Sequence, residues 1–511
     1  MSTMKNYIGL FFYIPEFVLS CFVMLQVPTN ARFLNILKNK FPIITKEASH
    51  QTMTVLMGTA YIYYIIIILL NNLFLIQDAL SAAAVVKILI LCLSTLIIYV
   101  ATPAINMQKL NHWEFFTVFL IAVISALLMI AADSLCAFYL LVELQALCFY
   151  ILASIDKESI FSAEAGLKYF VSGSIISGFF LMGISFIYGS LGALELSVIT
   201  NLLSGYEAPL TMPPFLLVGA FLVVATLLFK LACAPLHFWA PDVYDGAPLA
   251  STIILSVLPK LSLTIFFCRF LEAFQIFSAQ LGPIVVYSGV LSAVVGTFYA
   301  LKQVKVKKLL IYASIAQTGF LVASLGTYSS DGKVSALVFL FTYLLSTLAL
   351  WEIITRCYVS MSLLARFKKT PFGHLYVTDF SALGKTNFTY AFALLTILFS
   401  LGGIPYLAGF FGKVSVLQAL INGSYFGAAT ILCLIGAIAV YYYIRMIKMF
   451  FFDSRKYVTA NRAFMNFSKR DDDMSFRDFV FCCIVAFLFV GFFFCDPIIT
   501  LARYIIDSLF K

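Results

Sequence analysis

Long apolar runs separated by short polar segments dominate the sequence. Most runs are about 20 residues long, which is the length of a helix that crosses the hydrocarbon core of a bilayer. Hydropathy predicts about fourteen such spans, near residues 7–27, 52–76, 80–101, 115–132, 134–154, 165–190, 214–236, 248–270, 282–301, 308–326, 334–358, 388–420, 424–450 and 477–496. The spans leave no room for a folded soluble domain. The pattern therefore predicts an all-α polytopic membrane protein.

Lysine and arginine concentrate in alternate loops of this prediction. The richest segments are all odd-numbered loops, 32–46, 302–308, 366–385 and 448–477. The even-numbered loops hold almost none, apart from Arg269 and Lys333. Because a wrong number of spans would scramble this separation, the charges independently support fourteen helices with both termini on the less positive side.

The composition agrees with a membrane protein. Hydrophobic residues make up 62% of the chain and charged residues only 11%, whereas about 25% of residues are charged in soluble domains. A water-soluble fold is therefore excluded. The net charge of +9 lies in short loops between spans, so it reflects membrane orientation and does not indicate nucleic acid as a partner.

Two spans contain helix-breaking residues in their interior. FLVVATLLFKLACAPLHFWAPDVYDGAP carries Pro235 and Pro241, and LLTILFSLGGIPYLAGFFGKVSVL carries Gly402, Gly403 and Pro405. Proline removes a backbone donor and clashes with the preceding turn, so both helices should break. Irregular backbone at membrane depth survives only where it is buried in protein or lines a wet cavity. The two breaks are therefore the most informative parts of the chain.

The breaks also predict how the chain is organised. Both segments continue from an apolar run through L-x-x-x-P to an aromatic residue and a second half-helix, and they lie five spans apart. An odd offset makes two structural repeats inverted in the membrane. We predict an N-terminal three-helix segment (1–110), a first inverted repeat broken at Pro235 (111–275), a second broken at Pro405 (276–455), and an exposed loop with a C-terminal helix (456–511).

Four charged residues lie inside apolar spans. They are Glu143 in AFYLLVELQALCFYILAS, Lys230 just before the Pro235 break, Lys260 after Pro259 in mid-span, and Lys413 after GGIPYLAGFF. Each charge at a helix centre costs about 2.5–3.5 kcal/mol on insertion scales, so the four together oppose insertion by roughly 10 kcal/mol. A cost of this size indicates function.

A proton relay is the function that these residue types favour. In general, burial favours the neutral form of a lysine and a nearby carboxylate favours its charged form, so moving one partner switches the proton affinity of the other. Arginine does not suit this task because it stays protonated. The alternative is structural: each lysine extends to the interface, or forms an ion pair that only fixes helix packing.

Three further residues are weaker candidates for the same site. Glu164 and Lys168 in AEAGLKYF share a helix face at i,i+4 spacing, either as a surface ion pair or as groups that tune Lys230. His237 lies in the first break, where an imidazole could bridge a proton path or only make a structural hydrogen bond. The sequence shows no phosphate-binding glycine loop, nucleophile motif or metal-ligand cluster.

Several long stretches resemble one family. They are ELQALCFYILAS, EAGLKYFVSGSIISG, FKLACAPLHFWAPDVYDGAPLASTIILSVLPKLS, KVKKLLIYASIAQTGFLV, GGIPYLAGFFGKVSVL and YYYIRMIKMFFF, and together they cover about residues 133–452. These stretches resemble subunit 2 of respiratory complex I, the proton-translocating NADH:ubiquinone oxidoreductase, most closely in its mitochondrial form. The family's fold has fourteen helices with two inverted five-helix repeats, each containing one broken helix.

The resemblance implies a role for each candidate residue. Glu143 and Lys230 match the charged pair of the first half-channel, Lys260 the central relay, and Lys413 the link to the opposite side. His237, Lys168 and Glu164 match secondary positions near this path. One departure is Gln317, which cannot titrate and stands where many relatives carry histidine. A proton step at that position is therefore in doubt.

The resemblance also implies partners and a location. The chain would have no redox centre or cofactor of its own, and NADH, FMN, the iron–sulfur clusters and ubiquinone would be bound by partner subunits. Its partners would be two further antiporter-like subunits, small membrane subunits, accessory subunits and lipids such as cardiolipin. Its location would be the mitochondrial inner membrane. Residues 457–473, with the cluster KRDDD, match nothing in the family and are predicted to form an exposed loop that contacts peripheral subunits.

Two other functions remain open on the sequence. A stand-alone cation/proton antiporter subunit shares the fold and the buried lysines. A structural scaffold, whose charges only hold helices together while neighbouring subunits pump, would also carry them. The first alternative predicts sodium flux through the isolated subunit, and the second predicts that a neutral residue at position 230 leaves proton-coupled turnover intact.

Overall fold

The computed structural model describes residues 82–110, 112–205, 213–368, 375–380, 388–452 and 476–509, and these ranges are almost entirely α-helical. The helices of the first half are α3 (Ala82–Met107), α4 (Trp113–Ala131), α5 (Leu135–Ala153), α6 (Ile160–Leu191), α7 (Leu196–Ser204), α8 (Pro214–Lys230), α9 (Trp239–Gly246) and α10 (Leu249–Ala273). Those of the second half are α11 (Ser278–Lys302), α12 (Val306–Leu325), α13 (Ser330–Lys368), α15 (Phe388–Gly402), α16 (Ala408–Asn422), α17 (Phe426–Phe451), α19 (Phe476–Val490) and α20 (Cys495–Leu509).

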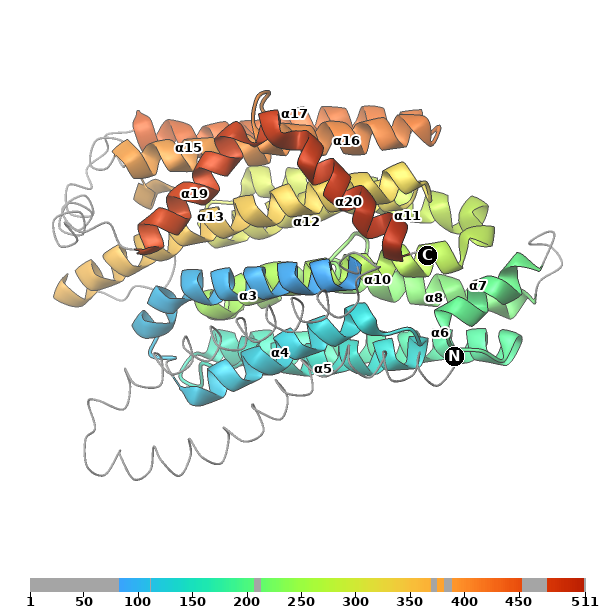
Figure 1. Ribbon diagram of the computed structural model, residues 1–511. Coiled ribbons are helices and arrows are strands. Elements are labelled where there is room, and N and C mark those ends of the chain that lie inside the picture. Colours follow the sequence, from blue (N-terminus) through green and yellow to red (C-terminus); the bar gives the residue numbers. More distant parts are fainter. Residues whose placement is uncertain are drawn as a thin grey trace, which may run out of the picture.

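Most of these helices run roughly parallel or antiparallel in one bundle (Figure 1). Among the described residues, ten helices are long and apolar enough to cross a membrane. Two shorter apolar helices, α8 and α15, are the first halves of the broken spans. The all-α polytopic fold is thus confirmed. The predicted spans 7–27 and 52–76 lie outside the described residues, so the total of fourteen stays a prediction.

The first break falls where the sequence predicts it. Helix α8 ends at Lys230, α9 begins at Trp239, and Pro235 lies in the irregular segment between them. Other parts of the chain satisfy the backbone groups that the break frees. The amide of Ala234 donates to Ser292 Oγ on α11 at 2.7 Å, and the indole of Trp239 donates to the carbonyl of Phe229 at 3.0 Å. Backbone and side-chain groups of the break are therefore paired within the protein, as membrane depth requires, although Pro235 and Phe238 are exposed.

The second break is also confirmed. Helix α15 ends at Gly402, α16 begins at Ala408, and the two halves lie end to end beside α17 (Figure 1). Gly403 has a φ of +79°, in the left-handed region that glycine adopts without strain. Inside the break the amide of Ile404 donates to the carbonyl of Phe399 at 3.1 Å, which closes the last turn of α15.

The order of helices supports two repeats. The first set is α4, α5, α6, the broken pair α8 and α9, and then α10. The second set is α11, α12, α13, the broken pair α15 and α16, and then α17. Each set has its break in the fourth span, which is the correspondence that the sequence predicts. The residue boundaries of the four predicted segments stay predictions.

The C-terminal region differs from the prediction. The sequence predicts one helix over 477–496, whereas the structure has α19, a 3-10 turn at Gly491–Phe494, and a second helix, α20, that bends away from α19 (Figure 1). Charged residues at 496, 503 and 507 lower the hydropathy of this stretch. Its other face is apolar, and Ile505 and Ile506 are buried where α20 packs against α13 and α3.

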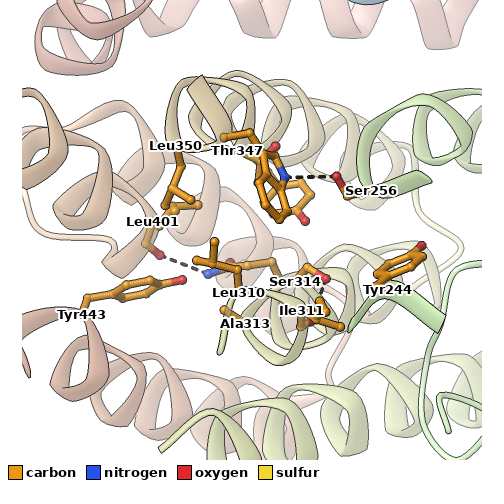
Figure 2. A pocket seen from close by; sticks show the side chains of 13 residues that line it. Tyr244, Ser256, Leu310, Ile311, Ala313, Ser314, Thr347, Leu350, Leu401 and Tyr443 are labelled. Carbon is orange, nitrogen blue, oxygen red and sulfur yellow. Dashed lines mark hydrogen bonds between the residues drawn. The ribbon is translucent and has the colours of Figure 1, made fainter. Parts of the chain in front are cut away.

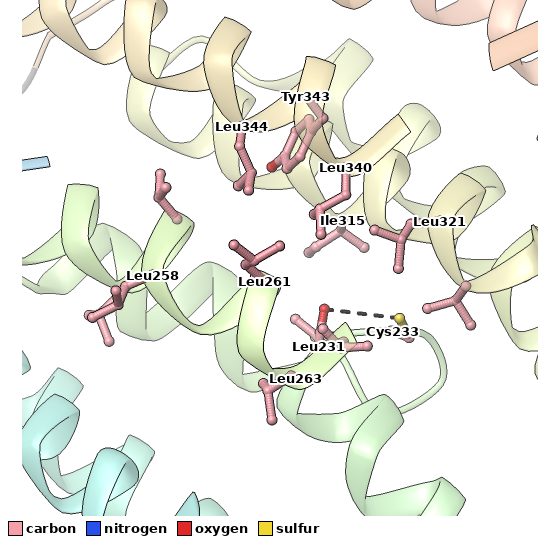
Figure 3. Close-up of a cluster of buried hydrophobic side chains, with 14 of the residues drawn as sticks. Leu231, Cys233, Leu258, Leu261, Leu263, Ile315, Leu321, Leu340, Tyr343 and Leu344 are labelled. Atoms are coloured by element: carbon pink, nitrogen blue, oxygen red, sulfur yellow. Dashed lines mark hydrogen bonds between the residues drawn. The ribbon is translucent and has the colours of Figure 1, made fainter. Parts of the chain in front are cut away.

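A cluster of apolar side chains occupies the centre of the bundle (Figure 3). It joins Leu231 and Cys233 of the first break to side chains of α10, α12 and α13, among them Leu261, Ile315 and Leu340. These residues are almost fully buried. Any polar group in this region must therefore find its partner within the protein, because unpaired polar groups in such surroundings are expensive.

Candidate functional site

Glu143 and Lys230 form an ion pair. Glu143 lies in the middle of α5, and Lys230 is the last residue of α8, where the first break begins. Lys230 Nζ lies 3.4 Å from Glu143 Oε1, and the side chains are only 10% and 21% exposed. The structure thus brings together the two residues that the sequence predicts as a pair. Each offsets part of the cost of burying the other.

Lys260 lies at the centre of the bundle. Its side chain is 6% exposed and points from α10 toward α13, where Nζ donates to the hydroxyl of Tyr343 at 2.6 Å. The same Nζ lies 4.5 Å from the centre of the Tyr343 ring. No carboxylate forms a salt bridge with Lys260 in the part of the chain that the structure describes. One tyrosine side chain therefore supplies both a hydrogen-bond acceptor and a ring face to this lysine.

Tyr343 is one of the residues that line a small cavity, whose surface is mostly apolar with a few polar side chains. Figure 2 shows this cavity from close by. Its volume is about 30 Å³, which exceeds the roughly 10–15 Å³ that one water molecule needs. Ser314 and Gln317 of α12 and Tyr443 of α17 line it together with Leu401 at the end of α15. The cavity thus lies between the tyrosine that binds Lys260 and the second break.

Lys413 is held by the second break. It belongs to α16, is 7% exposed, and donates to the carbonyls of Leu401 and Gly402 at 2.9 and 2.8 Å. These carbonyls are at the C-terminal end of α15 and have no partner within that helix turn. Gln317 Nε2 donates to the same Leu401 carbonyl at 3.1 Å (Figure 2). Gln317, which stands where many relatives carry histidine, therefore shares a backbone acceptor with Lys413.

Lys168 does not contact Lys230. It pairs with Glu164 on α6 at 2.8 Å and with Asp242 on α9 at 3.1 Å, and all three side chains are about half exposed. The predicted i,i+4 pair is therefore present. Its second partner links α6 to the half-helix that follows the first break. Exposed pairs of this kind contribute little to stability. The arrangement therefore fits a role in positioning α6 relative to α9.

His237 is buried in the first break, beside the ring of Phe238 at 4.6 Å between centroids. Its Nδ1 atom is buried and has no hydrogen-bond partner among the described residues. The structure therefore neither joins His237 to the lysines nor gives that nitrogen a structural bond. Both sequence interpretations of this residue stay open.

A larger polar cavity lies at the Lys-rich ends of the helices. Its volume is about 300 Å³, and its lining includes Asp156, Asp245, Lys305 and Lys307. Lys307 donates to the carbonyl of Asp245 at 3.2 Å, at the end of α9. Lys305 and Lys308 lie 3.7 and 3.5 Å from the Asp245 carboxylate. The sequence interpretation did not include these residues, although KVKK was recognised as part of a matching stretch.

The interpretation of the sequence also missed the ion pairs of two further basic residues, Lys333 and Arg356. Lys333 at the start of α13 pairs with Glu272 on α10. Farther along α13, Arg356 pairs with Glu352 at 2.7 Å and with Asp478 of α19 at 2.6 Å. The sequence does contain a signal for the pair of Glu352 and Arg356, because the two residues stand at i,i+4 spacing in the apolar run LALWEIITRC.

The described residues contain no group of side chains that could bind a metal ion. No three His, Cys, Asp or Glu side chains gather there closely enough to hold a metal ion. The charged groups instead form a series of lysines, each in contact with a carboxylate, a hydroxyl or a backbone carbonyl. Such a series can hold and pass protons.

Comparison with known proteins places the chain in a family. Residues 132–457 match the family described as NADH:quinone oxidoreductase/Mrp antiporter, TM. The chain is 33% identical to NADH-quinone oxidoreductase subunit N of Pelagibacter ubique, over 74% of this chain and 77% of that protein. The chain belongs to the family of NADH-quinone oxidoreductase subunit N and NADH-ubiquinone oxidoreductase chain 2.

Other family members and a solved structure agree. NADH-ubiquinone oxidoreductase chain 2 of Oenothera berteroana is 36% identical over 68% of this chain and 68% of that protein. A chain in the structure of respiratory complex I from Thermus thermophilus has the same fold, with a TM-score of 0.65 and 22% identity, over 93% of this chain and 98% of that chain. The subunit N/chain 2 family thus confirms the resemblance drawn from the sequence.

Proposed function

We propose that the chain moves protons across a membrane as a core subunit of proton-translocating NADH:quinone oxidoreductase. The observation that carries this proposal is the burial of three lysines at membrane depth, each in contact with a different polar partner. These contacts are Lys230 with a carboxylate, Lys260 with a hydroxyl and Lys413 with carbonyls. A series of such contacts suits stepwise proton transfer better than permanent ion pairing, since only the first of them is an ion pair.

The proposal includes a direction of coupling. Quinone reduction occurs in partner subunits, which bind NADH, FMN, iron–sulfur clusters and ubiquinone. A charge change at the subunit's edge separates Glu143 from Lys230, and the unpaired Lys230 then repels or releases a proton toward Lys260. The large cavity lined by Asp245 and Lys305 has room for water at the Lys-rich ends of the helices. The subunits N and chain 2 named above support this assignment by family membership.

The partners and location are part of the same proposal. We expect two further antiporter-like subunits, small membrane subunits, accessory subunits and lipids such as cardiolipin around this chain, in the mitochondrial inner membrane. Subcellular fractionation tests the location. Co-migration with NADH-oxidising activity that a quinone-site inhibitor blocks, on a native gel of mild-detergent membranes, tests the assembly. Migration apart from that activity would contradict it.

Replacement of Lys260 by methionine tests the relay. The assay is the number of protons moved per electron, together with coupled NADH turnover, in sealed vesicles that contain the assembled complex. We expect Lys260→Met to lower both quantities. Lys333→Met is the matched control, because Lys333 is also a buried lysine but pairs with Glu272 outside the proposed path. Equal effects of the two variants, or none from Lys260→Met, would contradict a relay and favour a scaffold.

A cation/proton antiporter is the second candidate, because the matching family also includes Mrp antiporters. It predicts sodium flux driven by a proton gradient through vesicles that contain this subunit alone. Absence of sodium flux, with proton translocation in the NADH-oxidising complex, would leave the first proposal.

A further inference from the structure

We infer that Tyr343 is a catalytic residue of the relay, which carries the proton of Lys260 into the cavity toward the second break. The inference rests on the proposed function and deepens it. Neither the sequence interpretation nor the family's charged positions point to this residue. Its place in the structure does, because it binds the central lysine and also lines the small cavity.

The contact with Lys260 has the geometry of a proton-transfer pair. Lys260 Nζ lies 2.6 Å from the Tyr343 hydroxyl, at the short end of the range of about 2.6–3.2 Å that general acid–base transfer requires. Both side chains are buried, at 6% and 5% exposure. In the described part of the chain, no other side chain hydrogen-bonds to Lys260 Nζ. A proton that leaves Lys260 through a side chain therefore leaves through Tyr343.

Tyr343 lies between a cluster of apolar side chains and the small cavity. Figure 3 shows Tyr343 beside the apolar side chains of Leu231, Leu261 and Leu340. On the other side Tyr343 lines the cavity of about 30 Å³ that also exposes Ser314 and Gln317. Proton transfer needs a series of donors and acceptors, which Ser314 and Gln317 supply in the cavity and the three leucines do not.

The transfer balances without any other reactant. An N–H bond of the Lys260 ammonium breaks as a bond forms to the Tyr343 oxygen. The proton that Tyr343 already carried leaves to a water molecule in the cavity, so the tyrosine remains neutral and lysine becomes a neutral amine. Across the cavity, the Leu401 carbonyl binds both Gln317 and Lys413. Tyr343 thus supplies the hydroxyl that accepts and donates a proton on this route, while Gln317 binds the backbone carbonyl of Leu401.

The test is Tyr343→Phe in the assembled complex. Phenylalanine keeps the ring that Lys260 faces at 4.5 Å and removes only the hydroxyl. Tyr244→Phe is the matched control, since Tyr244 lines the same cavity but donates its hydroxyl proton to the Leu255 carbonyl at 3.2 Å. Tyr343→His is the rescue variant, because an imidazole can accept and donate a proton.

Protons per electron and coupled turnover are measured in sealed vesicles after a native gel has shown assembly. We expect Tyr343→Phe to lower them as far as Lys260→Met does, with at least a tenfold slower coupled step, given that acid–base groups contribute about 10²–10⁴-fold. Tyr244→Phe should keep wild-type values, and Tyr343→His should recover part of the loss. Wild-type pumping by Tyr343→Phe, while Lys260→Met fails, would overturn the inference alone. Wild-type pumping by both variants would overturn the proposed function as well.

Discussion

The ion pair between Glu143 and Lys230 gives the sharpest test of how the site is built. At 3.4 Å and an effective dielectric constant of about 20, two unit charges attract each other by about 5 kcal/mol. Both side chains are largely buried, so removal of one partner leaves an uncompensated charge, which costs about 3–5 kcal/mol. We therefore expect Glu143→Gln and Lys230→Met each to destabilise the assembled complex.

The double variant separates stability from function. With Glu143→Gln and Lys230→Met combined, no unpaired charge remains, and replacing a buried ion pair by neutral residues is often close to neutral in free energy. The double variant should therefore be more stable than either single variant. It should still fail to translocate protons through this subunit, because the group that holds the proton is gone.

The measurement is the half-life of the complex at a fixed elevated temperature in mild detergent, followed by native gel and inhibitor-sensitive NADH oxidation. Proton translocation is measured on the same preparations in sealed vesicles. Additive losses in the double variant would refute the reasoning, since they would mean that the two charges do not stabilise each other. Normal proton translocation by the stable double variant would show that the pair is structural.

Two further predictions concern the second break and the C-terminal helix. Gly403→Ala should lower proton translocation more than Gly192→Ala does. Both glycines have a positive φ, but only at Gly403 would the new Cβ meet the Lys413 side chain, at 2.7 Å. At Gly192 the new Cβ would face open space. Each of the two variants should also lose about 1–3 kcal/mol of stability from backbone strain. Equal proton translocation by the two variants would therefore contradict a role for the position of the Lys413 side chain. Asp478→Asn should weaken the contact of residue 478 with Arg356, since a hydrogen bond to a charged group contributes about 1.5–3 kcal/mol to stability. Amide hydrogen exchange in α19 should become faster. Unchanged exchange would contradict it.

Local patterns in the sequence predict much of the fold. Membrane helices satisfy their own backbone bonds, so twenty apolar residues suffice to indicate a span. The breaks are equally local, since Pro235 and Pro405 interrupt a helix wherever it packs. The predicted last span corresponds to α19, but the sequence does not predict α20, because α20 is apolar on one face only and the burial of Ile505 depends on its neighbours α13 and α3.

The partners of the charged residues are less predictable. A carboxylate and a lysine buried in adjacent apolar spans suggest each other by their chemistry, and this suffices for Glu143 and Lys230. Lys260 offers no such clue, because its partner is one of 27 tyrosines in a chain where aromatic residues are common. Asp242 is likewise missed, because its contact with Lys168 joins positions 74 residues apart.

The breaks explain how lysines can be buried in this bundle at all. A helix that ends at membrane depth leaves its last carbonyls without partners and carries partial negative charge there. Lys413 donates to two of these carbonyls at the end of α15, and Lys230 lies in the last turn of α8. Each broken helix therefore supplies negative potential that offsets the cost of one buried cation. Lys260, in the unbroken α10, lacks this support and faces a tyrosine instead. Of the three lysines, it is the one whose hydrogen-bond partner is a hydroxyl, which can pass on a proton, and this suits the middle position of a relay.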